Sequence, residues 1–270
     1  MRCSLLFLTP LTALSLWAAD PTQPVVVSAA SPQVGLAPDS LATVYGPNLA
    51  TQTVSAGNPP WPTALGDMPG VTLVDSAGKR WPVPLIFVSS SQMNIYLPAG
   101  SATGPGTVEF PFTGLPPGVG AAALRIVPIS LQAVAPGIFT THGTGSGVLA
   151  ATAIRTSPVG GLQVEIPVFT CAAPGSCTPV PIDLGIDTPV YLSLYGTGIR
   201  GWTTLAPRLN ATVTIGGQSL PAAYAGPQPT VPGLDQVNVA LPLSLRGAGL
   251  VDVSVTVAGA TSNVGQIFIN

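Results

Sequence analysis

Short apolar runs separated by turn-forming residues dominate the chain from residue 20 onward. Between Val251 and Val257 the alternation is strict, with valine at every second position and Asp252, Ser254 and Thr256 between them. This period of two marks a strand that buries one face. No stretch of about 12 residues carries apolar residues at the spacing of three and four that an amphipathic helix requires. The pattern therefore predicts an all-β protein.

The expected strands are bounded by Gly, Pro, Asn and Asp, the usual residues of turns between strands. They recur at intervals of roughly 8–12 residues, which favours antiparallel sandwiches over a parallel sheet with intervening helices. The strands that we expect cover residues 25–28, 41–45, 71–74, 85–88, 93–97, 107–112, 124–127, 148–154, 163–169, 190–195, 211–215, 237–241, 251–257 and 266–269.

The chain also repeats its own pattern. An apolar run leads into Tyr45-Gly46 in the first copy and into Tyr195-Gly196 in the second. Further along, the sequence QMNIYLP that begins at Gln92 matches QVNVALP, which begins at Gln236. Each copy spans about 100 residues, the size of one immunoglobulin-like sandwich. We therefore expect two tandem immunoglobulin-like antiparallel β-sandwiches, the second with an added β-hairpin.

The first residues have the pattern of a secretory signal peptide. Arg2 precedes an apolar run from Leu5 to Trp17, and small residues come before Asp20. The alternative is an uncleaved anchor, but the run is short for a bilayer, which takes about 20 residues. We expect cleavage near Ala19, no membrane span in the mature chain, and a secreted or cell-surface location.

These signals divide the chain. Residues 1–19 are expected to be the signal peptide, residues 20–129 the first sandwich and residues 130–270 the second. The stretch from Val148 to Phe169 has no counterpart in the first copy. It is therefore expected to form an inserted hairpin at about 146–178, closed near its end by a cysteine-containing turn.

Two cysteines remain after removal of a signal peptide, Cys171 and Cys177. In an exported chain they most simply form one disulfide. A zinc site is the first alternative, but it needs two further ligands, and the one histidine, His142, lies in a Gly/Thr-rich stretch. A redox pair is the second, although such cysteines usually have two residues between them. We expect no metal and no cofactor.

The charge content narrows the classes of function. Charged residues make up 7% of the chain, against about 25% in ordinary soluble domains. Eight Lys and Arg oppose ten Asp and Glu, which leaves no basic patch for nucleic acid. No Gly-x-Ser-x-Gly elbow is present, and Asp183, Asp187 and Asp235 lack the spacing of a calcium loop. We therefore expect no enzymatic activity.

An ordered set of motifs covers the chain after residue 20 and resembles a known module. The set includes APDSLATVYGPNLA from Ala37, QMN from Gln92, APGIF from Ala135, LSLYGTG from Leu192 and DQVNV from Asp235. It is similar to IPT/TIG-type immunoglobulin-like repeats, and in particular to the tandem C-terminal module of a family of uncharacterised secreted bacterial proteins. The resemblance implies two β-sandwich domains on exported proteins and assigns no catalytic residue.

Four amide side chains are candidates for a site. Gln92 and Asn94 share one face of their strand, and Gln236 and Asn238 share a face of theirs. One interpretation is a polar strip for sugar hydroxyls, because amides both donate and accept hydrogen bonds. The other is a structural role, with the amides bonded to the backbone of neighbouring loops. Their presence in both copies favours the structural role.

Aromatic residues offer a second candidate. Trp61, Trp81, Trp202 and Tyr224 could form platforms for a glycan, and the sequence places Trp61 and Trp202 in loops. The alternative is that they fill gaps between loops and the core, as tryptophan often does.

The sequence favours an exported, non-catalytic protein that acts by surface contact, in adhesion or in binding to an envelope or matrix. Its expected partner is an extracellular protein or glycan, with no nucleic acid. A carbohydrate-binding module that uses the loop aromatics is the alternative. An unrecognised hydrolase is a remote one, since a fold does not forbid a function.

Overall fold

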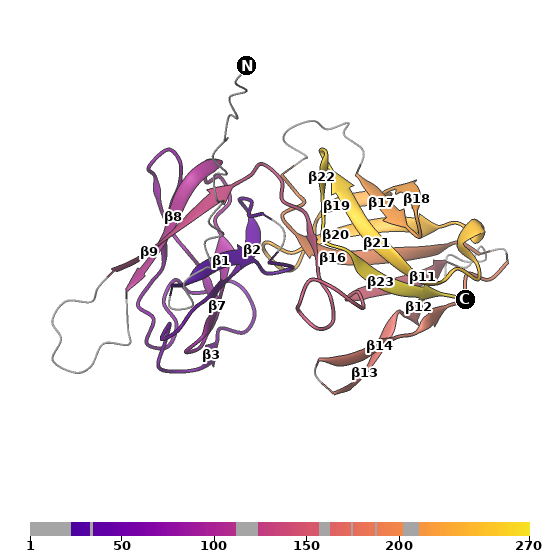
Figure 1. The fold of residues 1–270 in the computed structure, drawn as a ribbon, viewed down its shortest axis with the longest axis horizontal. Helices are drawn as coiled ribbons and strands as arrows, with labels where there is room; N and C mark the ends of the chain where they lie inside the picture. The colour runs from indigo at the N-terminus through magenta and orange to yellow at the C-terminus, as the bar shows by residue number, and fades with distance from the viewer. Residues whose placement is uncertain are drawn as a thin grey trace, which may run out of the picture.

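The computed structural model describes residues 23–32, 35–111, 124–156, 163–173, 175–186, 188–201 and 211–270. Within these ranges the chain forms strands and one 3-10 turn, Leu243–Leu245, but no α-helix (Figure 1). The expected all-β class is therefore confirmed. No helix in the described ranges is long and apolar enough to cross a membrane. The expected signal peptide, residues 1–19, lies outside them.

The N-terminal half contains two antiparallel sheets, with strand orders β1-β2-β7-β6-β3 and β5-β4-β8-β9. Buried side chains from both sheets, among them Val44, Ile95 and Phe110, form one hydrophobic cluster, so the sheets pack face to face. The strands are β1 Val25–Ser28, β2 Ser40–Tyr45, β3 Val54–Ser55, β4 Thr72–Val74, β5 Arg80–Pro82, β6 Leu85–Val88, β7 Gln92–Leu97, β8 Gly104–Pro111 and β9 Leu124–Leu131.

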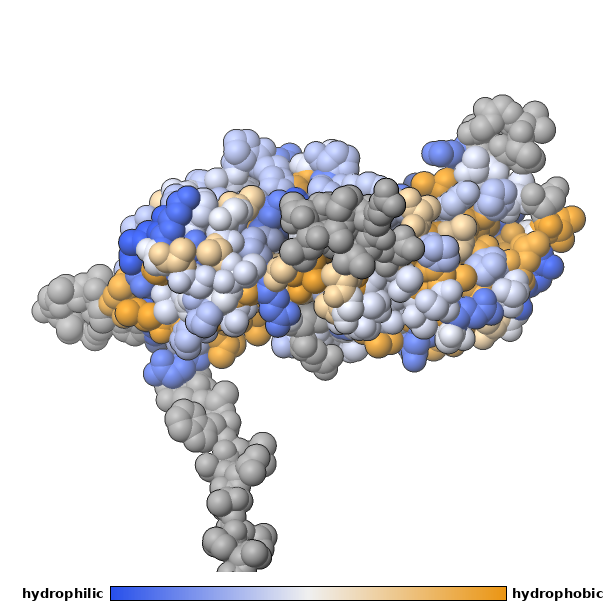
Figure 2. Space-filling model, turned by 90° about the horizontal axis from the view of Figure 1, so that it is seen from above, coloured by the Kyte–Doolittle hydropathy of each residue, from blue (hydrophilic) through white to orange (hydrophobic). Residues whose placement is uncertain are grey.

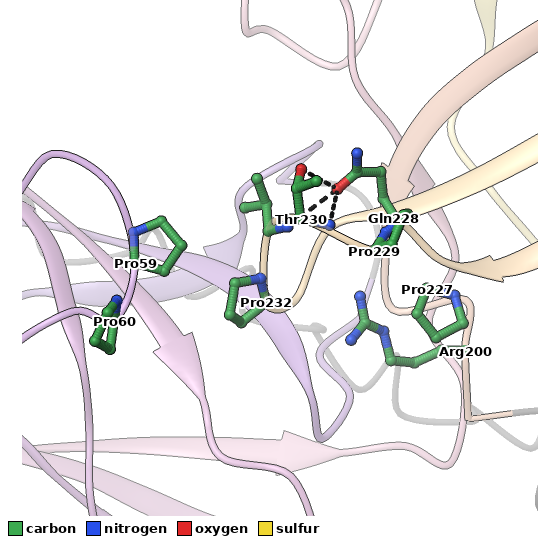
Figure 3. Close-up of a pocket in the computed structure, with 9 residues that line it drawn as sticks. Pro59, Pro60, Arg200, Pro227, Gln228, Pro229, Thr230 and Pro232 are labelled. Atoms are coloured by element: carbon green, nitrogen blue, oxygen red, sulfur yellow. Dashed lines mark hydrogen bonds between the residues drawn. The ribbon is translucent and has the colours of Figure 1, made fainter.

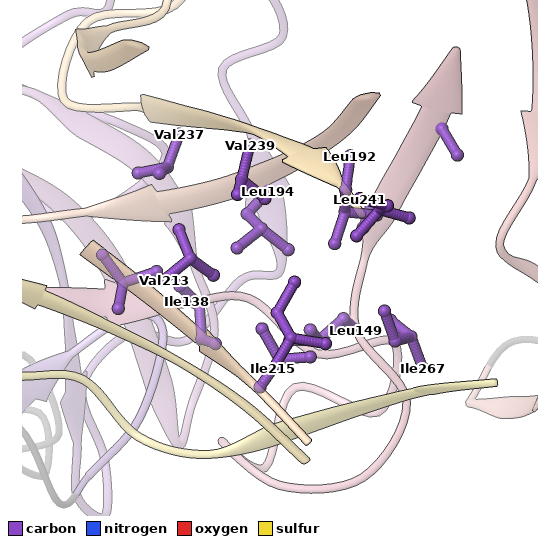
Figure 4. Close-up of a cluster of buried hydrophobic side chains, with 14 of the residues drawn as sticks. Ile138, Leu149, Leu192, Leu194, Val213, Ile215, Val237, Val239, Leu241 and Ile267 are labelled. Atoms are coloured by element: carbon purple, nitrogen blue, oxygen red, sulfur yellow. The ribbon is translucent and has the colours of Figure 1, made fainter. Parts of the chain in front are cut away.

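The C-terminal half repeats this arrangement with larger sheets. One has the order β12-β11-β16-β20-β19, with β10 paired to β16; the other has β15-β23-β21-β17-β18, with β22 paired to β21. Leu194 and Val237 of the first sheet meet Val213 and Ile267 of the second in a separate hydrophobic cluster (Figure 4). The strands are β10 Gly137–Ile138, β11 Ala151–Thr156, β12 Gln163–Pro167, β13 Phe169–Ala173, β14 Ser176–Pro179, β15 Pro181–Ile182, β16 Val190–Thr197, β17 Thr212–Ile215, β18 Gln218–Pro221, β19 Tyr224–Pro227, β20 Asp235–Leu241, β21 Gly249–Val257, β22 Ala260–Thr261 and β23 Gly265–Ile269.

The alternation read from the sequence decides which face of each strand is buried. On β21, Val253, Val255 and Val257 are fully buried, whereas Asp252 is exposed. Burial of one valine side chain stabilises a fold by about 1.5–3 kcal/mol, so the period of two fixes the orientation of the strand.

The inserted hairpin expected at about 146–178 differs in the structure, which has two separate hairpins there. Strand β11 pairs with β12 on one side and with β16 on the other, so it belongs to the large sheet. The small side chains Ala151 and Ala153 of β11 are buried in the core. Strand β11 is therefore part of the sandwich and not an insertion outside it. Likewise, β9 runs past the expected boundary at residue 129 to Leu131, which packs in the N-terminal cluster.

The second hairpin is a two-stranded ribbon, β13–β14, that projects from the C-terminal half (Figure 1). Cys171 and Cys177 lie directly opposite each other in its register, with 4.0 Å between their Cα atoms, and form the expected disulfide. The disulfide therefore crosslinks this ribbon and does not close the β11–β12 hairpin.

The two halves meet at a charged cluster centred on Arg200. Its Nε–H donates to Asp235 Oδ1 at 2.7 Å, and Nη1 donates to Asp39 Oδ1, which belongs to the N-terminal half, at 3.1 Å. The hydroxyl of Tyr96 donates to the same oxygen of Asp39 at 2.6 Å. Asp235 is fully buried, and this burial raises its pKa to about 6, against the opposing effects of Arg200 and the backbone N–H of Ile199.

Uncharged groups make a second set of contacts between the two halves. Leu41 donates its backbone N–H to Thr197 Oγ1 at 2.8 Å, and that hydroxyl donates to the carbonyl of Gly233 at 2.7 Å. Gly233 has φ +76° and lies so close to the N-terminal half that a Cβ would approach Leu41 Cδ2 to 2.9 Å and Tyr96 Cδ2 to 3.0 Å. Only glycine satisfies both the conformation and the contact.

Removal of the disulfide should affect the ribbon and leave the two cores intact. For Cys171→Ser combined with Cys177→Ser, we expect the free energy of unfolding to fall by at most about 2 kcal/mol, because the closed loop is short. Hydrogen exchange should accelerate in β13 and β14 but not in β16 and β20. Cooperative unfolding of the whole C-terminal half would contradict this, as would two free thiols in the wild-type protein.

Removal of the Arg200 side chain should lower the free energy of unfolding more than removal of the disulfide does. Arg200→Ala leaves the fully buried Asp235 without its cation, and we expect the free energy of unfolding to fall by about 3 kcal/mol. The matched control is Arg80→Ala. The Arg80 side chain is 60% exposed where it pairs with Glu109, so its loss should cost about 1 kcal/mol or less. Equal losses in urea unfolding of the two variants would show that the junction is not specially stabilising.

Candidate functional site

The outer face of the sheet β12-β11-β16-β20-β19 carries polar and aromatic side chains. On β16, Tyr191, Ser193 and Tyr195 alternate with Leu192 and Leu194, which are buried in the core. Because successive side chains of a strand point to opposite faces, the tyrosines and the serine lie on the side away from the core.

Neighbouring strands place further polar residues on the same face. The register sets Gln236 opposite Tyr195, and Asn238 opposite Ser193 on one side and Tyr224 on the other. Directly opposed residues of an antiparallel pair share a face and lie in contact distance. We call Tyr191, Tyr195, Tyr224, Gln236 and Asn238 the tyrosine–amide surface.

Tyr224 is held flat against the sheet. Its hydroxyl donates to the carbonyl of Pro227 at 2.5 Å, three residues along the same strand. A Cβ added at Gly226 would lie 3.2 Å from the Tyr224 hydroxyl and 3.4 Å from its Cζ, so the ring crosses the backbone at that glycine. The residue is nevertheless 42% exposed. Tyr224 is therefore a fixed aromatic plate with one side on the strand and the other open to solvent.

The two amides beside this plate are bonded to each other. Gln236 Nε2 donates to Asn238 Oδ1 at 2.8 Å along the outer face of β20. This bond uses one N–H of Gln236 and the oxygen of Asn238, so it leaves the Asn238 N–H groups and the Gln236 carbonyl for other partners. The pair therefore offers donors and an acceptor in a fixed arrangement.

The N-terminal half has an equivalent pair in the same register. Gln92 Nε2 donates to Asn94 Oδ1 at 2.8 Å, and Asn94 lies opposite Thr43 on β2 as Asn238 lies opposite Ser193. On the other side of Asn94 stands Phe87, which is half-buried. From the sequence, these amides were expected to bind sugar hydroxyls or the backbone of neighbouring loops. In the structure, each glutamine instead donates a hydrogen bond to the asparagine two residues further along its own strand.

Trp81 has a structural position. It packs against the N-terminal core, and its Nε1–H donates to Asp75 Oδ2 at 2.8 Å. The ammonium of Lys79 lies 3.5 Å from the centre of its ring. Asp75 also accepts hydrogen bonds from the backbone N–H groups of Ala77 and Ala102, so the indole belongs to a turn-stabilising network.

The remaining loop aromatics do not assemble into one platform. Trp61 is half-buried, donates from Nε1 to the Gly57 carbonyl at 3.0 Å, and has its ring centre 6.4 Å from that of Tyr96. It lies in the N-terminal half, as Trp81 does, whereas Tyr224 lies in the C-terminal half. Trp202 lies outside the described residues.

A shallow hollow of about 450 Å³ lies at the junction of the halves (Figure 3). Arg200 is the one charged residue of its lining, and that guanidinium is already bonded to Asp39 and Asp235. Gln228 accepts hydrogen bonds from Thr230 within the same loop. The other described residues of the lining are Pro59, Pro60, Pro227, Pro229, Val231 and Pro232. None of the side chains in this described lining transfers protons near neutral pH.

The titratable side chains are dispersed. Among the described residues, no three His, Cys, Asp or Glu side chains are grouped so that they could hold a metal ion. Asp183 pairs with Arg155 and Asp235 with Arg200, while Asp187 lies outside the described ranges. These carboxylates serve different ion pairs and do not converge.

No family model and no curated protein matches this chain. The resemblance to IPT/TIG-type repeats therefore stays a prediction that rests on the motifs themselves. The tyrosine–amide surface, defined by register and contacts, is the candidate site on which a functional argument can be built.

Two members of the tyrosine–amide surface were not among the candidates from sequence. In the sequence, Tyr195 is a landmark of the repeat, and Tyr191 belongs to the apolar run before it. The signal was present in the alternation of Tyr191, Ser193 and Tyr195 with leucines, which places three polar or amphipathic residues on one face. Their neighbours on β19 and β20 come from distant positions, and a local pattern does not reveal them.

The hydrogen bonds to Asp75 predict that the folded protein becomes less stable at acid pH. Hydrogen bonds from the backbone N–H of Ala102, the indole of Trp81 and other N–H groups lower the pKa of Asp75 to about 2. A carboxylate with a lowered pKa stabilises the fold above its ordinary value of 3.8, and this contribution is lost as the pH falls toward 2.

We expect Asp75→Asn to remove the part of the acid destabilisation that occurs between about pH 4 and about pH 2, as measured by urea unfolding at several pH values. Trp81→Phe keeps an aromatic side chain but removes the indole N–H donor, so its pH profile should lie between those of Asp75→Asn and the wild type. An unchanged profile in Asp75→Asn would show that this network does not control acid stability.

Proposed function

We propose that this protein is an exported, non-catalytic protein with two immunoglobulin-like sandwich domains that acts by surface contact, in adhesion or in binding to an envelope or matrix. The observation that carries the proposal is the tyrosine–amide surface, an open sheet face of polar and aromatic side chains. Such a face suits recognition by hydrogen bonds and ring contacts, because tyrosine offers both a ring and a hydroxyl.

The low charge of the exterior supports a contact of this kind. Along the described outer face of β12, β11, β16, β20 and β19, the one ionisable carboxylate is Glu165. Figure 2 shows strongly hydrophilic residues as scattered patches among weakly polar and apolar ones. A partner of this surface would therefore be bound with little help from long-range electrostatic attraction.

Export is supported by two features. The first is the disulfide between Cys171 and Cys177, since disulfides persist mainly in oxidising compartments outside the cytosol. The second is the pattern of residues 1–19 in the sequence, which is typical of a secretory signal peptide.

Carbohydrate binding is a second candidate, favoured by one specific observation. Tyr224 exposes a flat ring next to the bonded pair Gln236 and Asn238. Trp61 and Trp81 do not support it in the same way. Trp81 is bonded to Asp75 and covered by Lys79, and Trp61 is half-buried, with its indole N–H donated to the Gly57 carbonyl.

The proposal predicts contact that is insensitive to salt. The purified protein should be retained by cell-envelope or extracellular-matrix fractions of the organism that encodes it. We expect its apparent affinity to change by less than about twofold between roughly 50 and 500 mM NaCl, because few charges are available to be screened. A basic protein such as lysozyme serves as the salt-sensitive control. Absence of retention, or a loss of about tenfold or more in salt, would refute the proposal.

A further inference from the structure

The tyrosine–amide surface has the chemistry of a sugar-binding platform. One side of a pyranose ring carries C–H groups and packs on aromatic rings, while its edge carries hydroxyls that need donors and acceptors. Tyr224 supplies an exposed ring whose orientation is fixed by its bond to Pro227 and by the space above Gly226. Because the plate is already in place, little conformational entropy is lost on binding.

Hydrogen-bonding groups lie beside the plate at the right places. Asn238 is directly opposite Tyr224 in the register, and Gln236 is opposite Gly226, over which the ring lies. The bond from Gln236 to Asn238 holds both amides in position. Hydroxyls of a sugar stacked on Tyr224 would meet the Asn238 N–H groups and the Gln236 carbonyl at the edge of the plate.

A second ring lies two strands away. Tyr191 on β16 is 37% exposed and stands opposite Ala240 of β20, whose small side chain leaves the ring uncovered. Two strand spacings correspond to about 10 Å across the sheet, and the register displaces Tyr191 by two residues, roughly 7 Å, along the strands from the position in line with Tyr224. An extended sugar chain that runs obliquely over the strands would therefore contact both Tyr224 and Tyr191.

The chemistry of the face also selects the class of polysaccharide. It holds no basic side chain at its outward described positions, and its carboxylate, Glu165, lies at the far edge strand β12. An acidic polysaccharide would find no cation there. An oblique line of contacts over the strands fits an extended chain with equatorial linkages better than a coiled one.

We infer that the tyrosine–amide surface binds a neutral, β-1,4-linked polysaccharide, with Tyr224 and Tyr191 stacking on separate sugar rings of one chain and the Gln236–Asn238 pair bonding hydroxyls of that chain. This inference deepens the proposed function by naming the ligand class of the same surface. The equivalent face of the N-terminal half carries its exposed ring, Tyr45, opposite Gln92 at the end of β2. We do not assign the role to that face, because the position that matches Tyr224, beside Asn94, holds Phe87, which is half-buried and has no hydroxyl.

The test is affinity electrophoresis of the full mature chain in gels that contain glucomannan, hydroxyethylcellulose or xylan, followed by calorimetry with cellohexaose. We expect the wild type to be retarded in at least one neutral gel, and Tyr224→Ala to weaken the affinity by about tenfold or more. Tyr224→Phe keeps the ring and should retain most of the affinity. Because Tyr224 lies on the surface, its truncation opens no cavity in the core, and urea midpoints check that each variant is folded.

Matched controls come from the other half of the chain. Asn238→Ala and Asn94→Ala remove equivalent glutamine–asparagine bonds, but only Asn238→Ala should weaken polysaccharide binding. Equal effects of the two variants would overturn the inference, and so would retention only by polygalacturonate, an acidic chain. Absence of wild-type binding to all the neutral probes at concentrations up to about 1 mM would overturn it as well.

The two proposals fail in distinguishable ways. If envelope or matrix fractions retain both the wild type and Tyr224→Ala equally, surface contact stands and the sugar-binding inference falls. If those fractions retain neither, the contact function falls, while binding to the purified neutral polysaccharides is still measured directly. A protein partner that requires Tyr224, with no polysaccharide bound, would also refute the inference.

Discussion

The ion cluster around Arg200 fixes the arrangement on which the rest of the structure depends. A chain with 7% charged residues places one arginine between two carboxylates that are distant in sequence, Asp39 and Asp235. Asp235 is fully buried and begins β20, the strand that carries Gln236 and Asn238 on its outer face. The junction between the halves and the tyrosine–amide surface are therefore held by the same strand. A buried ion pair adds little net stability, but it penalises any other docking of the halves, because that would leave a buried charge unpaired.

Outside this cluster, hydroxyls, amides and tyrosines occupy most outward positions of β7, β16 and β20. Each copy satisfies its half-buried amides with a bond along the strand, Gln92 to Asn94 and Gln236 to Asn238, in the same cross-strand register. A half-buried amide without a partner would destabilise the sheet, so this bond is part of the fold as well as of the surface. That dual role explains how one motif occurs in both copies, with the exposed ring of Tyr45 opposite Gln92 in one copy and that of Tyr224 opposite Asn238 in the other.

The alternation of apolar and polar residues predicts the fold class and the main strands, and the two cysteines left in an exported chain predict the disulfide, because each of these depends on a local pattern. The alternation was insufficient for β11, whose small alanines gave too weak a signal to separate a core strand from an added hairpin. It also missed the pairing of Arg200 with Asp39, which joins residues 161 positions apart. The tyrosine–amide surface was foreseen only in part. Tyr224, Gln236 and Asn238 stood out as residue types, but their assembly depends on the register of three strands.

The comparison of the two halves shows how one framework produces two different surfaces. In the N-terminal half, the strand beside Asn94 is β6, where Phe87 is half-buried. In the C-terminal half the corresponding strand is β19, where Tyr224 lies across Gly226 and is anchored to Pro227. The two strands also differ in their surroundings, because β19 is an edge strand whereas β6 pairs with β3 on its other side, where Ser55 lies opposite Phe87. The two surfaces therefore differ at outward positions, where substitutions usually cost little stability, while the buried alternation of the neighbouring strands is the same in both halves.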